Sequence, residues 1–206
     1  MRRIRSRGSS KRTNEESELL TERFERALVY ATDLHREQRR KGSGVPYVAH
    51  LLAVCALTLE YGGDEDEAIA ALLHDAIEDQ GGAVARAEIL RQFGERVTEI
   101  VEGCTDTDES PKPPWRARKE EYIRHVREAP ASVRLVSACD KLHNARSLAM
   151  DYRVYGEALW DRFTGARDGT LWYYRAMVNA LRAAGTSPVV DELDRVVTEL
   201  ERLSSL

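Results

Sequence analysis

Apolar residues recur along this chain with the spacing of amphipathic helices. From Leu20 to Ala31 they return at three- and four-residue steps, which predicts a helix with one buried face. The apolar run LLAVCALTL follows the turn sequence GVPY. A third run, AIAALLHDAIED, follows Asp64 and Glu67, whose spacing is that of a capping box. These patterns predict three successive helices in the first half of the chain.

The second half continues in the same way. The run RLVSACDKLHNARSL predicts a long helix, Pro113 and Pro114 precede another, and Gly185 with Pro188 separates the last two. The final helix carries an apolar seam that we expect to pack on the domain or on a second subunit: Val189, Leu193, Val196, Leu200 and Leu203. No segment alternates with the period of a strand, and no internal repeat is present. We predict an all-α fold, with residues 18–206 forming a single compact helical bundle.

Composition and charge narrow the class of protein. The chain has 206 residues, of which 42% are hydrophobic, enough to bury a core without disulfides. The net charge of −4 gives no reason to expect a nucleic-acid partner. Its three cysteines lie apart, without metal-ligand spacing, and indicate free thiols in a reducing cytoplasm. No apolar run is long enough to span a membrane, and none follows the N-terminus as in a signal peptide.

Residues 1–17 form a polar segment that changes from basic to acidic. We predict that this tail is disordered and solvated, because it has too few apolar residues to pack. A basic arm that touches RNA is the alternative. The apolar seam of the last predicted helix leaves open whether the protein forms a homo-oligomer.

Four polar residues interrupt the run ALLHDAIED. His74, Asp75, Glu78 and Asp79 fall within an arc of roughly 140° on one helix. Carboxylates that are buried beside leucines without partners would cost several kcal/mol each. A divalent cation on this face would offset the repulsion, so the sequence predicts a metal site.

Further ligands must come from other helices. His50 opens one apolar run and Asp140 interrupts another, so both side chains are expected to point into the protein. With His74 and Asp75 they supply two imidazole nitrogens and carboxylate oxygens, a donor set suited to manganese, iron, nickel or zinc. Magnesium suits two imidazoles less well.

Four stretches together resemble the HD-domain metal-dependent phosphohydrolases, and more narrowly the RelA/SpoT-type branch that includes small alarmone hydrolases. They are HREQRRKGSGVPYVAH, ALLHDAIED, EILRQFGERVTEIVEGCTD and DKLHNAR, in the order of that family between His35 and Arg146. The resemblance implies that the metal ligands are His50, His74, Asp75 and Asp140. It implies that Glu78 and Asp79 serve the reacting water and phosphate, and that Arg40, Lys41 and Asn144 contact the nucleotide.

The other basic residues and histidines each have one or two candidate roles. Arg40, Lys41 and Arg146 would neutralise charge on a pyrophosphate, and Arg40 could instead stack on a purine. Arg116, Arg118 and Lys119 either reach substrate phosphates or form a solvated face. We expect His35 to be a core residue or a support for the site. His143 is expected to border the site and His125 to lie on the surface.

The chain departs from the family pattern at two positions near the ligands. Leu51 stands where the family usually has proline after its first metal histidine, and Gln80 where threonine often follows the Glu-Asp pair. The resemblance still implies a manganese-dependent hydrolase that acts on the 3′-diphosphate of a guanosine alarmone. Another HD-type phosphomonoesterase or phosphodiesterase, such as a nucleotidase, is the nearest alternative. A nucleotide sensor without catalysis is the second.

Overall fold

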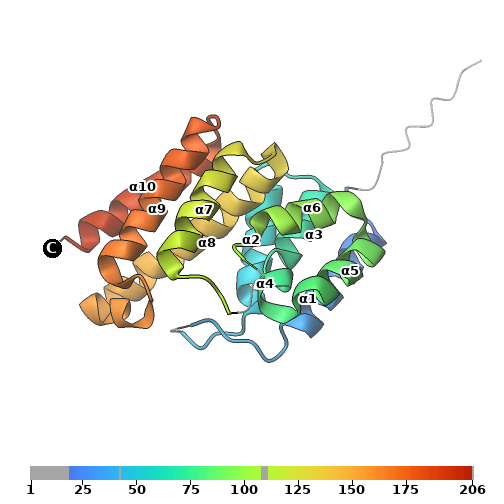
Figure 1. Cartoon of the computed structure of the whole chain (residues 1–206), viewed down its shortest axis with the longest axis horizontal. Helices are drawn as coiled ribbons and strands as arrows, with labels where there is room; N and C mark the ends of the chain where they lie inside the picture. The colour runs from blue at the N-terminus through green and yellow to red at the C-terminus, as the bar shows by residue number, and fades with distance from the viewer. Residues whose placement is uncertain (1–18, 42, 108–110, 206) are drawn as a thin grey trace, which may run out of the picture.

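A computed structural model describes residues 19–41, 43–107 and 111–205 of the chain. The predicted tail of residues 1–17 lies outside this range. Within it the secondary structure is helical, and one isolated bridge joins Arg39 to Pro46. The helices are α1 (Glu22–Leu34), α2 (Val48–Glu60), α3 (Glu65–Leu73), α4 (Ala76–Gln80), α5 (Gly82–Phe93), α6 (Glu95–Cys104), α7 (Trp115–Glu128), α8 (Ala131–Tyr155), the 3₁₀ helix η1 (Gly156–Arg162), α9 (Ala166–Ala183) and α10 (Pro188–Leu203) (Figure 1). The all-α prediction is confirmed.

The start of α3 shows why the chain forms a helix at this point. The Asp64 side chain accepts a hydrogen bond from the Glu67 backbone nitrogen, and the Glu67 carboxylate accepts one from the Asp64 nitrogen. This capping box satisfies two backbone donors that the helix would otherwise leave free. The capping pair predicted from the sequence is therefore confirmed.

The predicted single helix through ALLHDAIED is wrong in one respect. It divides into α3 and α4, and His74 and Asp75 form the turn between them. Asp75 has φ −98° and ψ 0°, at the margin of the right-handed helical region, and its carbonyl oxygen accepts the first hydrogen bond of α4 from the Asp79 nitrogen at 2.9 Å. Glu78 is half-buried and Asp79 is exposed, whereas His74 is buried.

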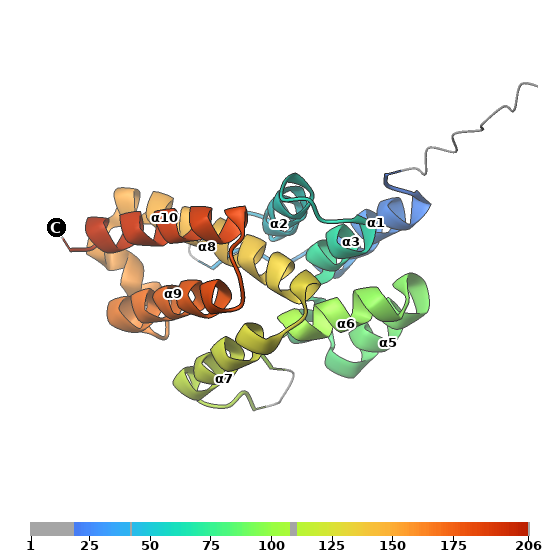
Figure 2. The ribbon, with the colours of Figure 1, turned by 90° about the horizontal axis from the view of Figure 1, so that it is seen from above.

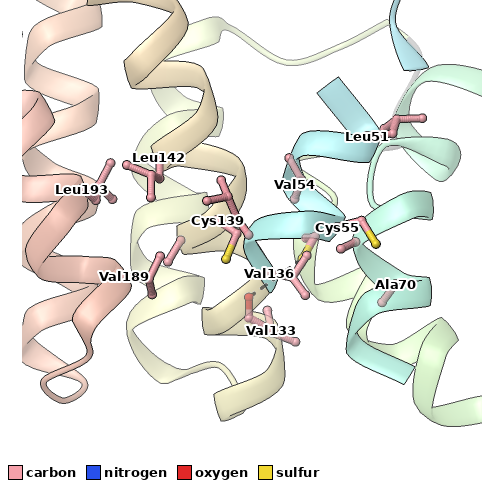
Figure 3. Packing of buried hydrophobic residues seen from close by; sticks show 14 of the residues in the cluster. Leu51, Val54, Cys55, Ala70, Val133, Val136, Cys139, Leu142, Val189 and Leu193 are labelled. Atoms are coloured by element: carbon pink, nitrogen blue, oxygen red, sulfur yellow. Dashed lines mark hydrogen bonds between the residues drawn. The ribbon is translucent and has the colours of Figure 1, made fainter. Parts of the chain in front are cut away.

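The long helix α8 holds the two halves of the molecule together. Helices α2, α3 and α6 pack against it on one side and α9 and α10 on the other (Figure 2). Side chains of α8 meet those of α2 and α10 in one apolar cluster (Figure 3), which includes Val54 and Cys55 of α2, Val136, Cys139 and Leu142 of α8, and Val189 and Leu193 of α10. Asp140 belongs to this helix, so its position is set by packing on both sides.

Two further predictions concern buried groups. The apolar seam of α10 packs on α8 and α9 within the chain, with Val189, Leu193, Val196 and Leu200 buried. Cys55, Cys104 and Cys139 are buried free thiols, as predicted.

In the described ranges, no helix is both long enough and apolar enough to cross a membrane.

Candidate metal centre

The four predicted ligands come together from α2, α8 and the turn between α3 and α4. His50 Nε2 lies 3.2 Å from Asp140 Oδ1 and 3.6 Å from Asp75 Oδ2. His74 Nε2 lies 3.0 Å from Asp75 Oδ2 and 3.7 Å from Asp140 Oδ1. One donor atom from each of His50, His74 and Asp140 falls within 4.8 Å of the others, and all three residues are buried. The atoms that face one another are those that could bind a single cation.

Hydrogen bonds to the far side of each imidazole orient both histidines. His74 Nδ1 donates to the Ala71 carbonyl oxygen at 2.8 Å, which leaves the lone pair of Nε2 directed toward the carboxylates. His50 Nδ1 shares a 2.8 Å hydrogen bond with His143 Nδ1. Burial, followed by the neighbouring His50, lowers the pKa of His143 to about 4. Neutral His143 can therefore accept the proton of His50 Nδ1, and His50 Nε2 also presents a lone pair.

The two carboxylates of the cluster, Asp75 and Asp140, are oriented by other side chains. The Tyr47 hydroxyl donates to Asp75 Oδ2 at 2.6 Å, and the Asn144 amide donates to Asp140 Oδ1 at 2.5 Å. Lys141 forms an ion pair with the other oxygen of Asp140. Such outer contacts fix the direction of metal ligands in proteins.

The electrostatics of the cluster favour positive charge at its centre. Burial alone would raise the pKa of Asp140, but the Lys141 ammonium and the two imidazoles hold it well below its usual range. For Asp75, burial is likewise outweighed, chiefly by His74. The carboxylates in turn raise the pKa of His74 well above its ordinary value against the effect of burial. His74 Nε2 is buried and lies 3.0 Å from Asp75 Oδ2, but it makes no geometrically satisfactory hydrogen bond with another residue of the described ranges. A divalent cation fits this donor set.

Glu78 and Asp79 line the same cavity of about 580 Å³ but stand apart from the four ligands. Lys112 Nζ contacts Glu78 Oε1 at 2.8 Å, and the Gln38 amide donates to Asp79 Oδ2 at 2.7 Å. Both carboxylates are thus held at the cavity wall, within reach of water.

Arg40, Lys41 and Asn144 also line the cavity. Arg40 donates to the Asn144 side-chain oxygen at 2.7 Å, which joins the loop before α2 to α8. Arg146 is the predicted substrate residue that the structure does not bring to the cavity: it pairs with Glu192 of α10 at 2.9 Å. Two residues along a helix turn a side chain by about 200°, so Asn144 and Arg146 must face opposite sides.

Three basic residues with an undecided role lie at the start of α7. Lys119 lines the cavity and pairs with Asp106 at 2.8 Å. Arg118 also pairs with Asp106, while the Arg116 guanidinium lies 3.2 Å from the ring centre of Trp172. Lys119 is therefore the member of this group that faces the site.

The histidines outside the ligand set lie as follows. His35 is buried and its ring stacks on Tyr47, with centroids 5.3 Å apart. His143 contacts His50, as described above, and His125 is exposed on α7.

Sequence reasoning missed Tyr47 and Lys141, which contact Asp75 and Asp140 directly. A weak signal existed for both. Lys141 follows Asp140 inside an apolar run, and Tyr47 lies three residues before His50. A charged or hydroxyl-bearing side chain that close to a ligand is a candidate for orienting it.

The helical fold and the cluster of two histidines and two aspartates can be compared with those of known proteins. Residues 27–170 match the family model described as HD domain, and the chain belongs to this family. The family resemblance inferred from the motifs is confirmed.

Two of the curated relatives share the name guanosine-3′,5′-bis(diphosphate) 3′-pyrophosphohydrolase. The chain is 37% identical over 125 residues to the guanosine-3′,5′-bis(diphosphate) 3′-pyrophosphohydrolase MESH1 of Xenopus tropicalis, covering 59% of this chain and 67% of that protein. It is 38% identical over 130 residues to the guanosine-3′,5′-bis(diphosphate) 3′-pyrophosphohydrolase of Aquifex aeolicus, covering 62% of this chain. The chain spans only 18% of the length of the Aquifex protein.

Solved structures show the same fold. A metazoan ortholog of SpoT that hydrolyses ppGpp superposes with a TM-score of 0.71 at 29% identity, covering 85% of this chain and 94% of that one. The structure of lmo0812 from Listeria monocytogenes EGD-e has a TM-score of 0.65 at 29% identity, covering 72% and 96% of the two chains.

Proposed function

We propose that this protein is a metal-dependent phosphohydrolase that removes the 3′-diphosphate from guanosine 3′-diphosphate 5′-di(tri)phosphate. The observation that carries the proposal is the convergence of two imidazoles and two carboxylates beside Glu78 and Asp79 in one cavity. A protein that only binds nucleotide has no need of further carboxylates beside a cation. The substrate is proposed from similarity to relatives that are guanosine-3′,5′-bis(diphosphate) 3′-pyrophosphohydrolases.

His50, His74, Asp75 and Asp140 would hold the cation, and their mixed nitrogen and oxygen donors suit Mn²⁺. When bound, such a cation activates water near neutral pH and offsets negative charge on the phosphoryl group. The other tasks belong to side chains of this protein.

Glu78 and Asp79 would handle protons and orient the attacking water. In the reaction, water forms a bond to the 3′-phosphorus and the bond from that phosphorus to the ribose 3′-oxygen breaks. One carboxylate accepts a proton from the water, and the departing ribose oxygen must gain one. Lys112 and Gln38 hold the two carboxylates through one oxygen each, which leaves the other oxygen of each for this role.

Arg40, Lys41 and Asn144 would bind the nucleotide. Asn144 positions the Arg40 guanidinium, which also lies 5.9 Å from the ring centre of Tyr47. Exposed Lys41 at the cavity rim provides charge for phosphates. Arg40 has two candidate roles in this binding: its guanidinium can pair with a phosphate or stack on the base.

We further propose that residues 18–206 act as one domain, and that it works in the cytoplasm. The second part of this proposal rests on the three buried free thiols and on the nucleotide substrate.

The test is a substrate screen with the purified protein and Mn²⁺. We expect ppGpp and pppGpp to give pyrophosphate and GDP or GTP, with little orthophosphate. Glu78→Gln is the matched inactive control, because it keeps the size of the side chain. Release of orthophosphate from many nucleotides would indicate a general phosphomonoesterase. Tight nucleotide binding without turnover of any substrate would indicate a sensor, and either result would refute the proposal.

A further inference from the structure

The cavity extends beyond the metal centre along one face of α8. Six polar residues of this helix line it, and at about 100° per residue four of them lie within an arc of roughly 60°. This α8 stripe consists of Asp140, Asn144, Ser147 and Asp151. Asp151 lies three turns beyond Asp140, about 16 Å along the helix axis. Side chains on a helix lean toward its N-terminus, so the Asp151 carboxylate is directed back toward the metal centre.

The chemistry of the cavity wall changes along the stripe. Around Asp140 the lining is charged and includes His50 and Lys141. Within one turn of Asp151 on the same helix lie the apolar residues Leu148 and Met150, and Phe163 also lines the cavity. A nucleotide has the same asymmetry, since its phosphates are anionic and its base has apolar faces. A substrate with its 3′-phosphates at the metal centre would place its base near Asp151.

Asp151 differs from the other acidic residues that line this cavity in the described parts of the chain. The others are ligands or are held by Lys112, Gln38 or Lys119. Asp151 is half-buried and makes no hydrogen bond or ion pair with another described residue. Both of its carboxylate oxygens are therefore free to accept hydrogen bonds from a ligand.

We infer that Asp151 sets base specificity by accepting hydrogen bonds from N1–H and the 2-amino group of guanine. This inference rests on the proposed function, because that function places the phosphates at the metal centre. Guanine carries two adjacent donors on this edge, which match the two oxygens of one carboxylate. Adenine has an acceptor at N1, and its lone pair would face the anion. Hypoxanthine keeps N1–H but lacks the amino group.

The experiment compares ppGpp with its inosine and adenosine counterparts. In the wild type we expect kcat/KM to fall in the order guanosine, inosine, adenosine. Asp151→Asn replaces one acceptor oxygen with a donor, and should lower kcat/KM on ppGpp by about 10-fold to 100-fold, mainly through KM. The loss on the adenosine counterpart should be much smaller, so the preference for guanine falls at least about tenfold. Asp161→Asn, the same change at an exposed residue of η1 outside the cavity lining, should behave as wild type.

Two outcomes overturn the inference. One is an equal loss on all three substrates in Asp151→Asn, which would indicate a structural role. The other is an unchanged preference for guanine. If the wild type hydrolyses none of the three, the proposed function fails, and calorimetric binding of GDP and ADP then tests the base specificity separately. In that case, equal affinity of the wild type for the two nucleotides, or a preference for GDP that Asp151→Asn leaves unchanged, would refute the role of Asp151.

Discussion

Replacing Tyr47 by phenylalanine removes one hydrogen bond to Asp75, a proposed metal ligand, and leaves the aromatic ring in place. The hydroxyl donates to Asp75 Oδ2 at 2.6 Å. Burial, and then the charge of Asp75, raise the pKa of Tyr47, so the phenol keeps its proton at any pH suitable for an assay. In the variant, Asp75 keeps its charge but loses the contact that orients it.

The structure sets the size of the effect. A hydrogen bond to a charged group contributes about 1.5 to 3 kcal/mol. The Asp75 side chain is 20% exposed, so water can replace part of this contact. A loss near the lower end, about 1.5 to 2 kcal/mol, corresponds to Mn²⁺ affinity weakened by about 12-fold to 30-fold.

Titration with Mn²⁺, followed by the paramagnetic resonance signal of the free ion, measures this affinity directly. At saturating Mn²⁺ we expect kcat to recover to within about threefold of wild type. Tyr30→Phe, the same change on α1 away from the cavity, is the matched control. Tyr47→Phe with an affinity within about twofold of wild type would refute the view that this contact orients the ligand. A lower kcat with unchanged affinity would place Tyr47 against the substrate.

Four other substitutions test separate parts of the molecule. His74→Ala should lose bound metal and activity together, whereas His125→Ala, a change at an exposed residue of α7, should lose neither; metal analysis of both proteins decides. Glu78→Gln should retain the metal while kcat falls by about 100-fold or more, and near-normal turnover would remove this residue from the mechanism. Lys41→Ala should lower kcat/KM on ppGpp by about 10-fold to 100-fold, with a much smaller loss on p-nitrophenyl phosphate; equal losses would contradict a role in binding the nucleotide. Asp64→Ala removes the cap of α3 and should lower the free energy of unfolding by about 0.5 to 2 kcal/mol in urea titrations, and an unchanged midpoint would show that the cap contributes nothing.

Several features of the candidate site could be predicted because they disturb a local pattern. His50, His74 and Asp140 each interrupt or open an apolar run, and a buried titratable side chain in such a run needs a partner. The position of Arg146 could also have been excluded from the sequence. Asn144 lies two residues away on the same helix, so one of the two had to face away from the cavity.

Other features depend on contacts between distant parts of the chain. Tyr47 meets Asp75 across 28 residues, and Arg40 meets Asn144 across 104. The turn at His74 and Asp75 is not visible in the pattern either, because apolar residues continue at helical spacing on both sides of it. Helical periodicity describes which face of a segment is buried, but it contains no information on where the next segment will lie.

The sequence by itself therefore determined the helices, the all-α class and the identity of the residues that could bind a cation. Each of these depends on the spacing of side chains along one segment. Only the tertiary structure decided that α8 packs between α2 and α10, which brings Asp140 within 3.2 Å of His50. It also decided that the Asp151 carboxylate has no partner among the described residues around the same cavity. The physical reason is that packing and hydrogen bonding act between surfaces, and those surfaces meet only after the helices have formed and docked.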